Sequence, residues 1–261
     1  MQYETLNVDI AGYVATVTLN RPDVRNAFNE TMIADITSAF TTLNTRDDVR
    51  AVVLAANGKA FCAGADLNWM KKMAGYSDDE NRADAMLLAN MLSSIYRCNK
   101  PVIGRVNGDA YAGGMGLISA CDIVVAVESA RFCLSEARLG LIPATIAPYV
   151  IRALGEQASR RYFITAEQFD CATALRLGLV SEAVPAEQLD ATVQQIAQTL
   201  CANGPQAVRA CKQLVQDMAG RELNGALIED TAARIARTRA GAEGREGVAS
   251  FLEKRTPAWR D

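Results

Sequence analysis

Two short stretches carry residues whose types and spacing could do chemistry. A strand-like run at 131–134 delivers Glu136 at its end, between apolar neighbours, so Glu136 is a candidate general acid or base. Upstream, the glycine-rich stretch 112–116 (Ala-Gly-Gly-Met-Gly) leads into an apolar segment, 117–121, that is predicted to be a buried helix. Glycines at the start of a helix let a ligand approach backbone N–H groups that lack partners inside the helix. Such a position attracts negative charge.

Both stretches also have a plain structural interpretation. Glycine clusters commonly serve tight turns and close helix packing, and these glycines form neither a GxGxxG motif nor a Walker loop. Phosphate cradling therefore has little support. A single glutamate is more commonly a solvated or ion-paired surface group than a catalytic one.

The absence of histidine narrows the chemistry. It excludes serine–histidine and cysteine–histidine catalysis, histidine-ligated zinc and histidine general bases. Proton transfer must then fall to a carboxylate, a lysine, a tyrosine, a cysteine or water. Any carboxylate in a pocket becomes a stronger candidate.

A second turn of small residues spans 57–67, directly after an apolar run at 51–55 that reads as a strand buried on both faces. On its own this turn would be interpreted as a loop whose alanines and glycines allow close packing.

Composition limits the class of protein. The chain has 261 residues, half of them hydrophobic, and a net charge of −3, which argues against a broad nucleic-acid surface. No apolar run is long enough to cross a bilayer, and the N-terminus lacks a basic-then-apolar signal, so we expect a cytoplasmic protein without a membrane partner. The seven scattered cysteines include no CxxC pair, which predicts reduced thiols and no metal site.

The remaining pattern predicts an α/β protein. Strands are expected in a hairpin at 6–10 and 13–19 and at 51–55, 101–106, 122–127, 131–134 and 179–184. Helices are expected at 29–43 with Asn29 as N-cap, and at 83–96, 146–154, 158–164, 166–177, 186–201, 207–218, 222–239 and 244–254. The segment 203–205 (Asn-Gly-Pro) is the best candidate linker. The expected division is a core at 1–203 with the site, and a helical region at 204–261 for packing or oligomerisation.

At this point the residues resemble the crotonase family, the enoyl-CoA hydratase/isomerase superfamily. The resemblance runs over nearly the whole chain and lies in the order and spacing of several motifs, each weak alone: Asn20-Arg21-Pro22 with Asn26-Ala27, Phe61 to Leu67, Pro101-Val102-Ile103 with Asn107-Gly108, Gly113-Gly114 before Cys121-Asp122-Ile123, and Glu136 with Leu139-Gly140 and Pro143.

The resemblance implies a spiral of β-β-α superturns with a C-terminal helical region that builds trimers, often paired into hexamers. It implies an acyl-CoA thioester ligand and no cofactor, because coenzyme A is part of the substrate. The backbone N–H groups of Ala65 and Gly113 would form the oxyanion hole around the thioester oxygen, where charge builds as an enolate forms. Coenzyme A contacts would fall on Arg25, Ala63, Asp66, Leu67 and Asn68, and on Phe251 and Lys254 reaching the nucleotide of a neighbouring subunit. An amphipathic helix with a lysine at its edge explains the last two equally well.

One departure from the family matters most. Hydratases of the two-glutamate kind carry a glutamate at the position of Gly116 and a second at Glu136, and only the second is present here. Glu136 would carry the proton transfers alone, with its pKa raised by burial beside the thioester. Gly116, next to Gly114 in the expected substrate pocket, would instead leave space for a branched acyl chain.

Two chemistries survive this loss: hydration of a 2-enoyl-CoA, and movement of a double bond as in enoyl-CoA isomerases. The segments 65–70 and 135–144 look most like methylglutaconyl-CoA and related carboxylated-enoyl-CoA hydratases of leucine and isoprenoid breakdown, which favours hydration. A terminal carboxylate would then need a cation or donors, for which the candidates are Lys71, Lys72, Tyr76, Arg82, Arg105 and Arg138. A third hypothesis is a non-catalytic relative that binds acyl-CoA or RNA, against which the net acidity and Glu136 both speak.

Overall fold

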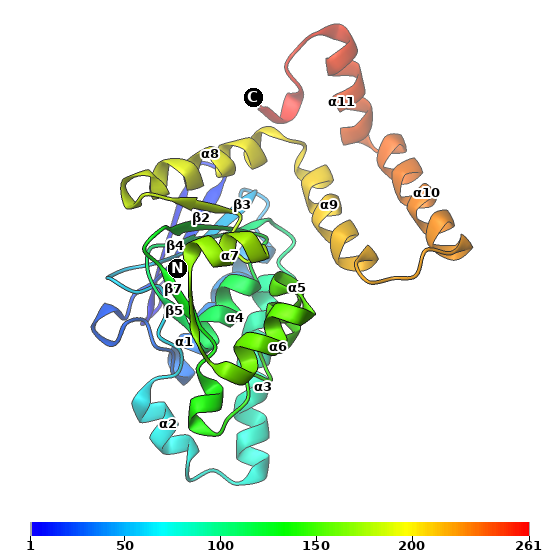
Figure 1. The fold of residues 1–261 in the computed structure, drawn as a ribbon. Coiled ribbons are helices and arrows are strands. Elements are labelled where there is room, and N and C mark those ends of the chain that lie inside the picture. The colour runs from blue at the N-terminus through cyan, green and yellow to red at the C-terminus, as the bar shows by residue number, and fades with distance from the viewer. Residues whose placement is uncertain (1, 261) are drawn as a thin grey trace.

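The computed structural model describes residues 2–260, which form an α/β body and a C-terminal arm of three helices, α9–α11 (Figure 1). The larger sheet has the strand order β1-β2-β3-β4-β6-β9, in which β1 and β2 form the expected hairpin and the other neighbours are parallel. Its strands are β1 (Leu6–Ala11), β2 (Val14–Leu19), β3 (Ala51–Ala56), β4 (Val102–Val106), β6 (Ile123–Val127) and β9 (Glu182–Val184).

Burial explains why the central strands are so apolar. Every residue of β3 is buried, because parallel neighbours flank it and side chains cover both faces of the sheet. The continuous apolar run at 51–55 predicted this correctly.

A second, three-stranded sheet has the order β5-β7-β8, formed by β5 (Ala110–Tyr111), β7 (Arg131–Cys133) and β8 (Gln168–Asp170). The predicted helix at 166–177 is wrong in its first part. Ala166 has a positive φ of 51° and ends the preceding helix, so the chain can turn and pair β8 with β7. The helix α7 (Cys171–Leu177) starts only after Asp170, whose side chain accepts a hydrogen bond from the Thr173 N–H.

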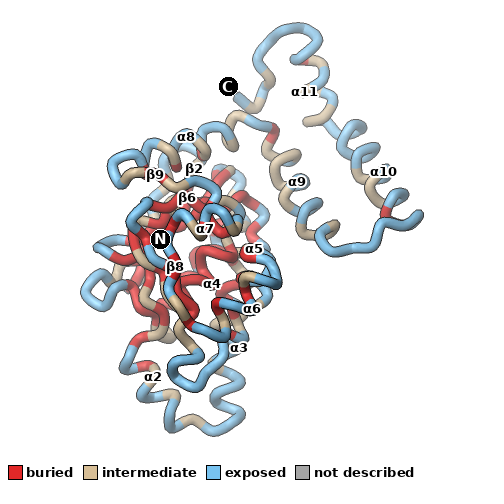
Figure 2. Tube along the Cα trace, viewed as in Figure 1, coloured by how far each residue is buried: buried red, intermediate tan, exposed pale blue. Residues whose placement is uncertain are grey.

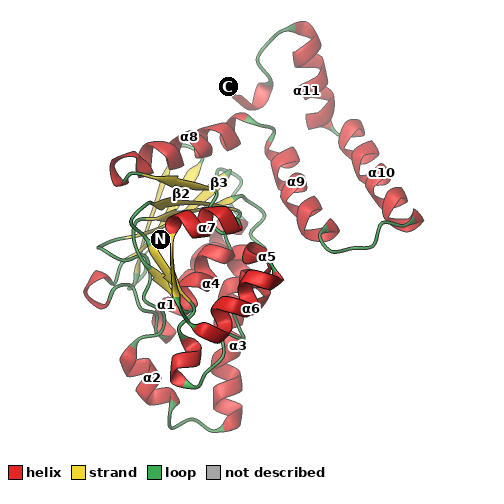
Figure 3. Ribbon diagram, viewed as in Figure 1, coloured by secondary structure: helices red, strands yellow, loops and turns green. Residues whose placement is uncertain are grey.

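Helices cover both sheets (Figure 3). Those of the body are α1 (Glu30–Asn44), α2 (Leu67–Met73), α3 (Asp78–Tyr96), α4 (Gly113–Ser119), α5 (Ala147–Leu154), α6 (Glu156–Thr165), α7 and α8 (Leu189–Ala202). Asn29 caps α1 as predicted, since its side chain accepts a hydrogen bond from the Met32 N–H. The helix α2 follows the small-residue turn and was not predicted.

The glycine-rich stretch is itself helical. The helix α4 starts at Gly113 rather than after the glycines, and all seven of its residues are buried. It packs against α5, which places the glycines where helices approach one another closely.

The arm of α9 (Pro205–Met218), α10 (Gly225–Ala240) and α11 (Ala242–Glu253) projects away from the body, and Figure 2 shows it mostly exposed. Its first helix is held to the body by Lys212, whose ammonium lies 2.7 Å from an Asp122 carboxylate oxygen and donates to the Lys100 carbonyl. Within residues 2–260, no helix is both long enough and apolar enough to span a membrane.

Candidate active site

Short parallel pairing brings three distant segments to one place. Cys62 pairs in parallel with Ala110, and the Tyr111 N–H donates to the Cys62 carbonyl at 2.9 Å. The strands β5 and β7 are also parallel, with Tyr111 opposite Cys133. Because parallel strands leave a sheet at the same edge, the residues that follow each strand emerge together. These residues are the three proposed catalytic groups, Ala65, Gly113 and Glu136.

The Ala65 N–H is left free by a change of direction at Gly64. Gly64 has a φ of +92°, which favours glycine, and its carbonyl accepts a hydrogen bond from the Phe28 N–H at 2.8 Å. Across a trans peptide the C=O and N–H point in opposite directions, so the Ala65 N–H points away from Phe28. It has no hydrogen-bond acceptor among the residues that the structure describes.

The Gly113 N–H is exposed by a second unusual conformation. Ala112 has φ 47° and ψ −118°, a region that costs a residue with a side chain about 1–3 kcal/mol. Its carbonyl accepts from the Met115 N–H at 2.9 Å, which turns the following Gly113 N–H outward from the start of α4. This N–H too has no acceptor within the described part of the chain.

Close packing holds these two turns together. A Cβ placed on Gly64 would lie 3.7 Å from the Gly113 nitrogen, so the turns that carry the two donors are in contact. A Cβ on Gly113 would lie 2.1 Å from the ring of Phe28, and one on Gly114 would lie 2.5 Å from the Cys62 carbonyl oxygen. Both positions therefore require glycine for packing alone, and the packing fixes where the donors stand.

Glu136 opens a short 3-10 helix, Glu136–Leu139, just after β7. Its Oε2 atom is buried and accepts no hydrogen bond from any residue of 2–260. Burial raises the pKa of this carboxyl above its ordinary value, and a hydrogen bond from its own backbone opposes this only in part. A half-buried carboxyl group with one oxygen free of hydrogen bonds is a group that can both take and give a proton.

The raised pKa predicts how stability varies with pH. Below the ordinary pKa near 4.5, Glu136 is protonated in both folded and unfolded chains. As pH rises through this value the unfolded chain releases its proton first, so the free energy of unfolding falls until the folded-state pKa is passed. We expect Glu136→Gln to gain stability over the wild type as pH rises from about 4 to 7, in urea unfolding curves measured across that range.

Glu167 provides the control, because Arg161 donates to its carboxylate and lowers its pKa. Glu167→Gln should be less stable than the wild type near neutral pH. This difference in the free energy of unfolding should disappear as the pH falls. A stability difference for Glu136→Gln that is constant over this range would contradict the expected titration.

The space beside Gly116 is filled rather than open. A Cβ there would lie 2.4 Å from Ile146 Cγ2 and 3.3 Å from a methyl of Leu92. The interpretation of Gly116 as space for an acyl chain is therefore corrected: in this structure Gly116 admits Ile146, and the position supplies no second carboxylate.

The residues expected to contact coenzyme A lie beside the first turn. The Ala63 N–H donates to the Arg25 carbonyl at 3.0 Å, so these two are neighbours, and Leu67 and Asn68 are exposed at the start of α2. Asp66 is different, because its side chain is buried and has structural partners. It accepts a hydrogen bond from the Asn68 N–H at the start of α2 and lies 2.9 Å from the Arg21 guanidinium.

These partners decide the ionisation of Asp66. Burial opposes its charged form, but the Asn68 N–H and the Arg21 guanidinium outweigh burial and lower the pKa. We expect Asp66→Ala to lose both the cap and the ion pair and to lower the free energy of unfolding by about 1–2 kcal/mol. Asp66→Asn should cost less, since an amide oxygen still caps α2. Urea unfolding measures the order of the two, and hydrogen exchange of the α2 amides should be faster in the alanine variant alone; equal costs would contradict a capping role.

Two expected contacts lie far along the chain, in the arm. Phe251 is 81% exposed in α11, and Lys254 ends that helix with a φ of 54°. In the single chain they face solvent, which is compatible both with a helix edge and with a contact to another subunit.

The candidates for a distal carboxylate separate into two groups. Lys72 pairs with Glu30, Arg105 pairs with Asp190, and Arg138 donates to the Ala166 carbonyl. Lys71, Tyr76 and Arg82 lie on α2, after it and on α3. Tyr76 also interacts with Lys72, and a role of these three toward a distal carboxylate stays a prediction.

Sequence reasoning gave no role to several residues that shape this site. Asn26 is fully buried, and its amide nitrogen donates to the Asn57 and Ala60 carbonyls. Arg21 holds Asp66, and the ring of Phe28 packs on Gly113. The available signal was the motif 20–22 with 26–27, which marked the resemblance without indicating these contacts.

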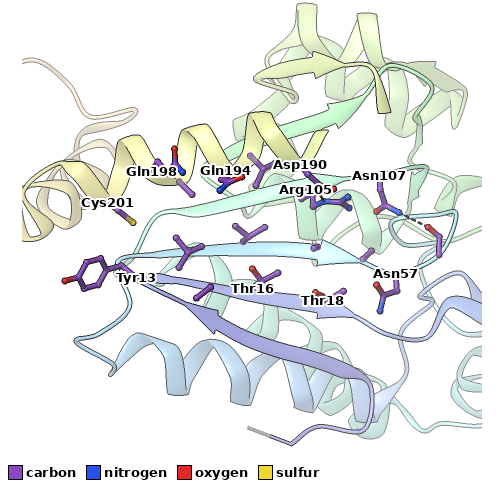
Figure 4. Close-up of a pocket in the computed structure, with 18 residues that line it drawn as sticks. Tyr13, Thr16, Thr18, Asn57, Arg105, Asn107, Asp190, Gln194, Gln198 and Cys201 are labelled. Carbon is purple, nitrogen blue, oxygen red and sulfur yellow. Dashed lines mark hydrogen bonds and ion pairs between the residues drawn. The ribbon is translucent and has the colours of Figure 1, made fainter. Parts of the chain in front are cut away.

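A cavity of about 750 Å³ lies elsewhere, between the larger sheet and α8. Figure 4 shows Thr16, Thr18 and Arg105 on its sheet side and Asp190, Gln194 and Gln198 on its helix side. The Arg105–Asp190 ion pair lies in this groove, so Arg105 belongs to it. Within residues 2–260, no group of three histidine, cysteine, aspartate or glutamate side chains could hold a metal ion.

Known proteins share this fold over nearly the whole chain. The family model described as enoyl-CoA hydratase/isomerase matches residues 9–261. A mevalonyl-coenzyme A hydratase of Aspergillus fumigatus is 34% identical over 95% of this chain and 92% of its own. The crystal structure of an enoyl-CoA hydratase from Shewanella pealeana superposes with a TM-score of 0.96 at 42% identity, covering 99% of this chain and 97% of that one. Pseudomonas aeruginosa AtuE superposes with a TM-score of 0.94 at 34% identity, over 99% and 100%. The expected fold is thereby confirmed, and the chain belongs to the enoyl-CoA hydratase/isomerase family.

Proposed function

We propose that this protein adds water to a short, branched or carboxylated 2-enoyl-CoA and forms the 3-hydroxyacyl-CoA. The proposal is carried by two unpaired backbone donors, on Ala65 and Gly113, whose turns are in contact. They lie beside the strand β7, which leads to Glu136 and its buried Oε2 atom without a hydrogen bond. Family membership and relatives named as hydratases support the same reaction.

In the proposed reaction Glu136 takes a proton from water, and the resulting hydroxide forms a bond to C3 of the substrate. The electron pair of the double bond moves towards the thioester, whose oxygen becomes negative and accepts hydrogen bonds from Ala65 and Gly113. The protonated Glu136 then gives its proton to C2 and the carbonyl re-forms. Its raised pKa suits both steps, because the proton is neither held too tightly nor lost too readily.

A second candidate is favoured by the filled space at Gly116. Position 116 carries no carboxyl group and Ile146 fills the space beside it, so Glu136 is the one carboxyl group proposed for the site. One carboxyl group suffices to carry a proton from C2 to C4 of a 3-enoyl-CoA, which is isomerisation without uptake of water. Hydration is favoured over isomerisation because relatives of this chain are named as hydratases.

One experiment separates these candidates. The protein is incubated with 2-enoyl-CoA and 3-enoyl-CoA thioesters, with and without a terminal carboxylate, in water enriched in oxygen-18. A hydratase incorporates the label into a 3-hydroxyacyl product, whereas an isomerase gives an unlabelled conjugated enoyl product. Absence of both products across the panel would contradict an enzymatic role and favour the hypothesis of a non-catalytic binding protein. A mobility shift that weakens as salt rises would then reveal association with RNA.

We further propose that the arm of α9–α11 is the assembly region of a trimer or a dimer of trimers. Its exposed large apolar side chains support this, because single soluble chains rarely leave so many in water. They are Leu214, Val215, Leu223, Ile228, Ile235, Val248, Phe251 and Leu252.

A further inference from the structure

Each proposed donor follows a residue with positive φ, but the two residues differ in kind. Gly64 precedes Ala65, and φ +92° is accessible to glycine. Ala112 precedes Gly113 and carries a methyl group at φ 47°. The left-handed residues Arg25 and Ala166 have ψ of 38° and 24°, a region that side chains can reach, whereas ψ of Ala112 is −118°. Glycine would adopt the Ala112 conformation more easily, so the methyl needs an explanation.

Three contacts hold Ala112 in this conformation. Its N–H donates to the Cys133 carbonyl at 2.8 Å, and its own carbonyl accepts from the Met115 N–H at 2.9 Å. Its methyl faces the first turn, because a Cβ on Gly64 would lie 3.0 Å from the Ala112 Cβ. Ala112 thus touches the strand that leads to Glu136, the helix that begins with Gly113 and the turn that carries Ala65.

We propose that the methyl of Ala112 is a positioning group: by resting against Gly64 it fixes the rotation of the Ala112–Gly113 peptide, and with it the direction of the Gly113 N–H. The inference rests on the proposed function, since it takes the Gly113 N–H to meet the thioester oxygen. With glycine at position 112 both hydrogen bonds remain available, but the contact with Gly64 is lost and the peptide gains rotational freedom. A donor that must be aligned in advance is weakened by such freedom.

The test is Ala112→Gly. We expect kcat to fall about tenfold or more, because the donor acts on the charge that develops in the transition state, while KM for the thioester stays within about twofold. The thermal midpoint should be unchanged or higher, because glycine relieves the backbone strain. A conjugated aryl-enoyl-CoA, added by rapid mixing and observed before turnover, should show a smaller shift to long wavelength on binding than with the wild type, since that shift reports polarisation of the carbonyl.

Ala166→Gly is the matched control, with the same change at a positive φ of 51°, at the residue that ends α6. It should leave kcat and the spectrum unchanged and keep or raise the thermal midpoint. Wild-type kcat and a full spectral shift in Ala112→Gly would overturn the inference while the proposed function stands. A wild-type protein that does not shift the spectrum and does not turn over any enoyl-CoA would instead overturn the proposed function.

Discussion

Glu136→Gln should reduce kcat for hydration by about 100- to 10,000-fold, the range that a positioned general acid or base contributes. Glutamine has the same shape but cannot take a proton from water or return one to carbon. The Oε2 atom accepts no hydrogen bond within residues 2–260, so the substitution breaks no hydrogen bond of this atom. Binding should therefore survive, and KM or the dissociation constant of a 3-hydroxyacyl-CoA should change only a few fold. Steady-state kinetics and calorimetric titration measure the two quantities separately.

A second readout isolates the proton transfer to carbon. In deuterated water the wild type should exchange hydrogen at C2 of the hydroxyacyl product, and Glu136→Gln should not. Glu167→Gln is the control for a neutralised glutamate, because Glu167 lies on the surface and pairs with Arg161. Turnover within about threefold of the wild type in Glu136→Gln would show that another group moves the proton.

Gly113→Ala should have the second largest effect, reducing kcat by about 100- to 1,000-fold through displacement of one oxyanion donor. The added methyl would lie 2.1 Å from Phe28 Cζ, and this ring has little room to move. It is 1% exposed and packs edge-on against Trp69, with ring centroids 6.3 Å apart. Either the ring or the start of α4 must shift, and we expect a loss of about 1–3 kcal/mol in the free energy of unfolding from this overpacking.

Two further variants distinguish the clash from a general effect of alanine. Gly225→Ala, at a position in α10 where a methyl meets nothing within 4 Å, should be neutral or slightly stabilising. Phe28→Leu combined with Gly113→Ala should be more stable than the sum of the two single changes predicts, because leucine gives the methyl room. Additive effects in this double-mutant cycle would show that Phe28 and position 113 do not compete for space.

Local patterns in the sequence predicted the elements whose cause is local. The N-cap of α1 and the fully buried β3 follow from residues a few positions apart, and both are confirmed. The wrong prediction at 166–170 has a non-local cause: a composition compatible with a helix is overridden because β7 offers β8 a partner strand. Only the folded chain reveals such a partner.

The candidate site shows the same division. The glycines at 113, 114 and 116 marked a close approach of some kind, but the sequence could not say to what. The structure shows the Phe28 ring, the Cys62 carbonyl and Ile146, each from a different part of the chain. Asp66 was likewise predicted as a ligand contact from the resemblance, while its ion pair with Arg21 depends on a loop that folds beside it.

The exposed apolar side of α9–α11 has a consequence for how the protein behaves on dilution. If copies of the chain cover this side for one another, their association and the order of the arm are linked by mass action. The midpoint of thermal unfolding should then rise with protein concentration, and the arm should become sensitive to proteases at low concentration well before the body does.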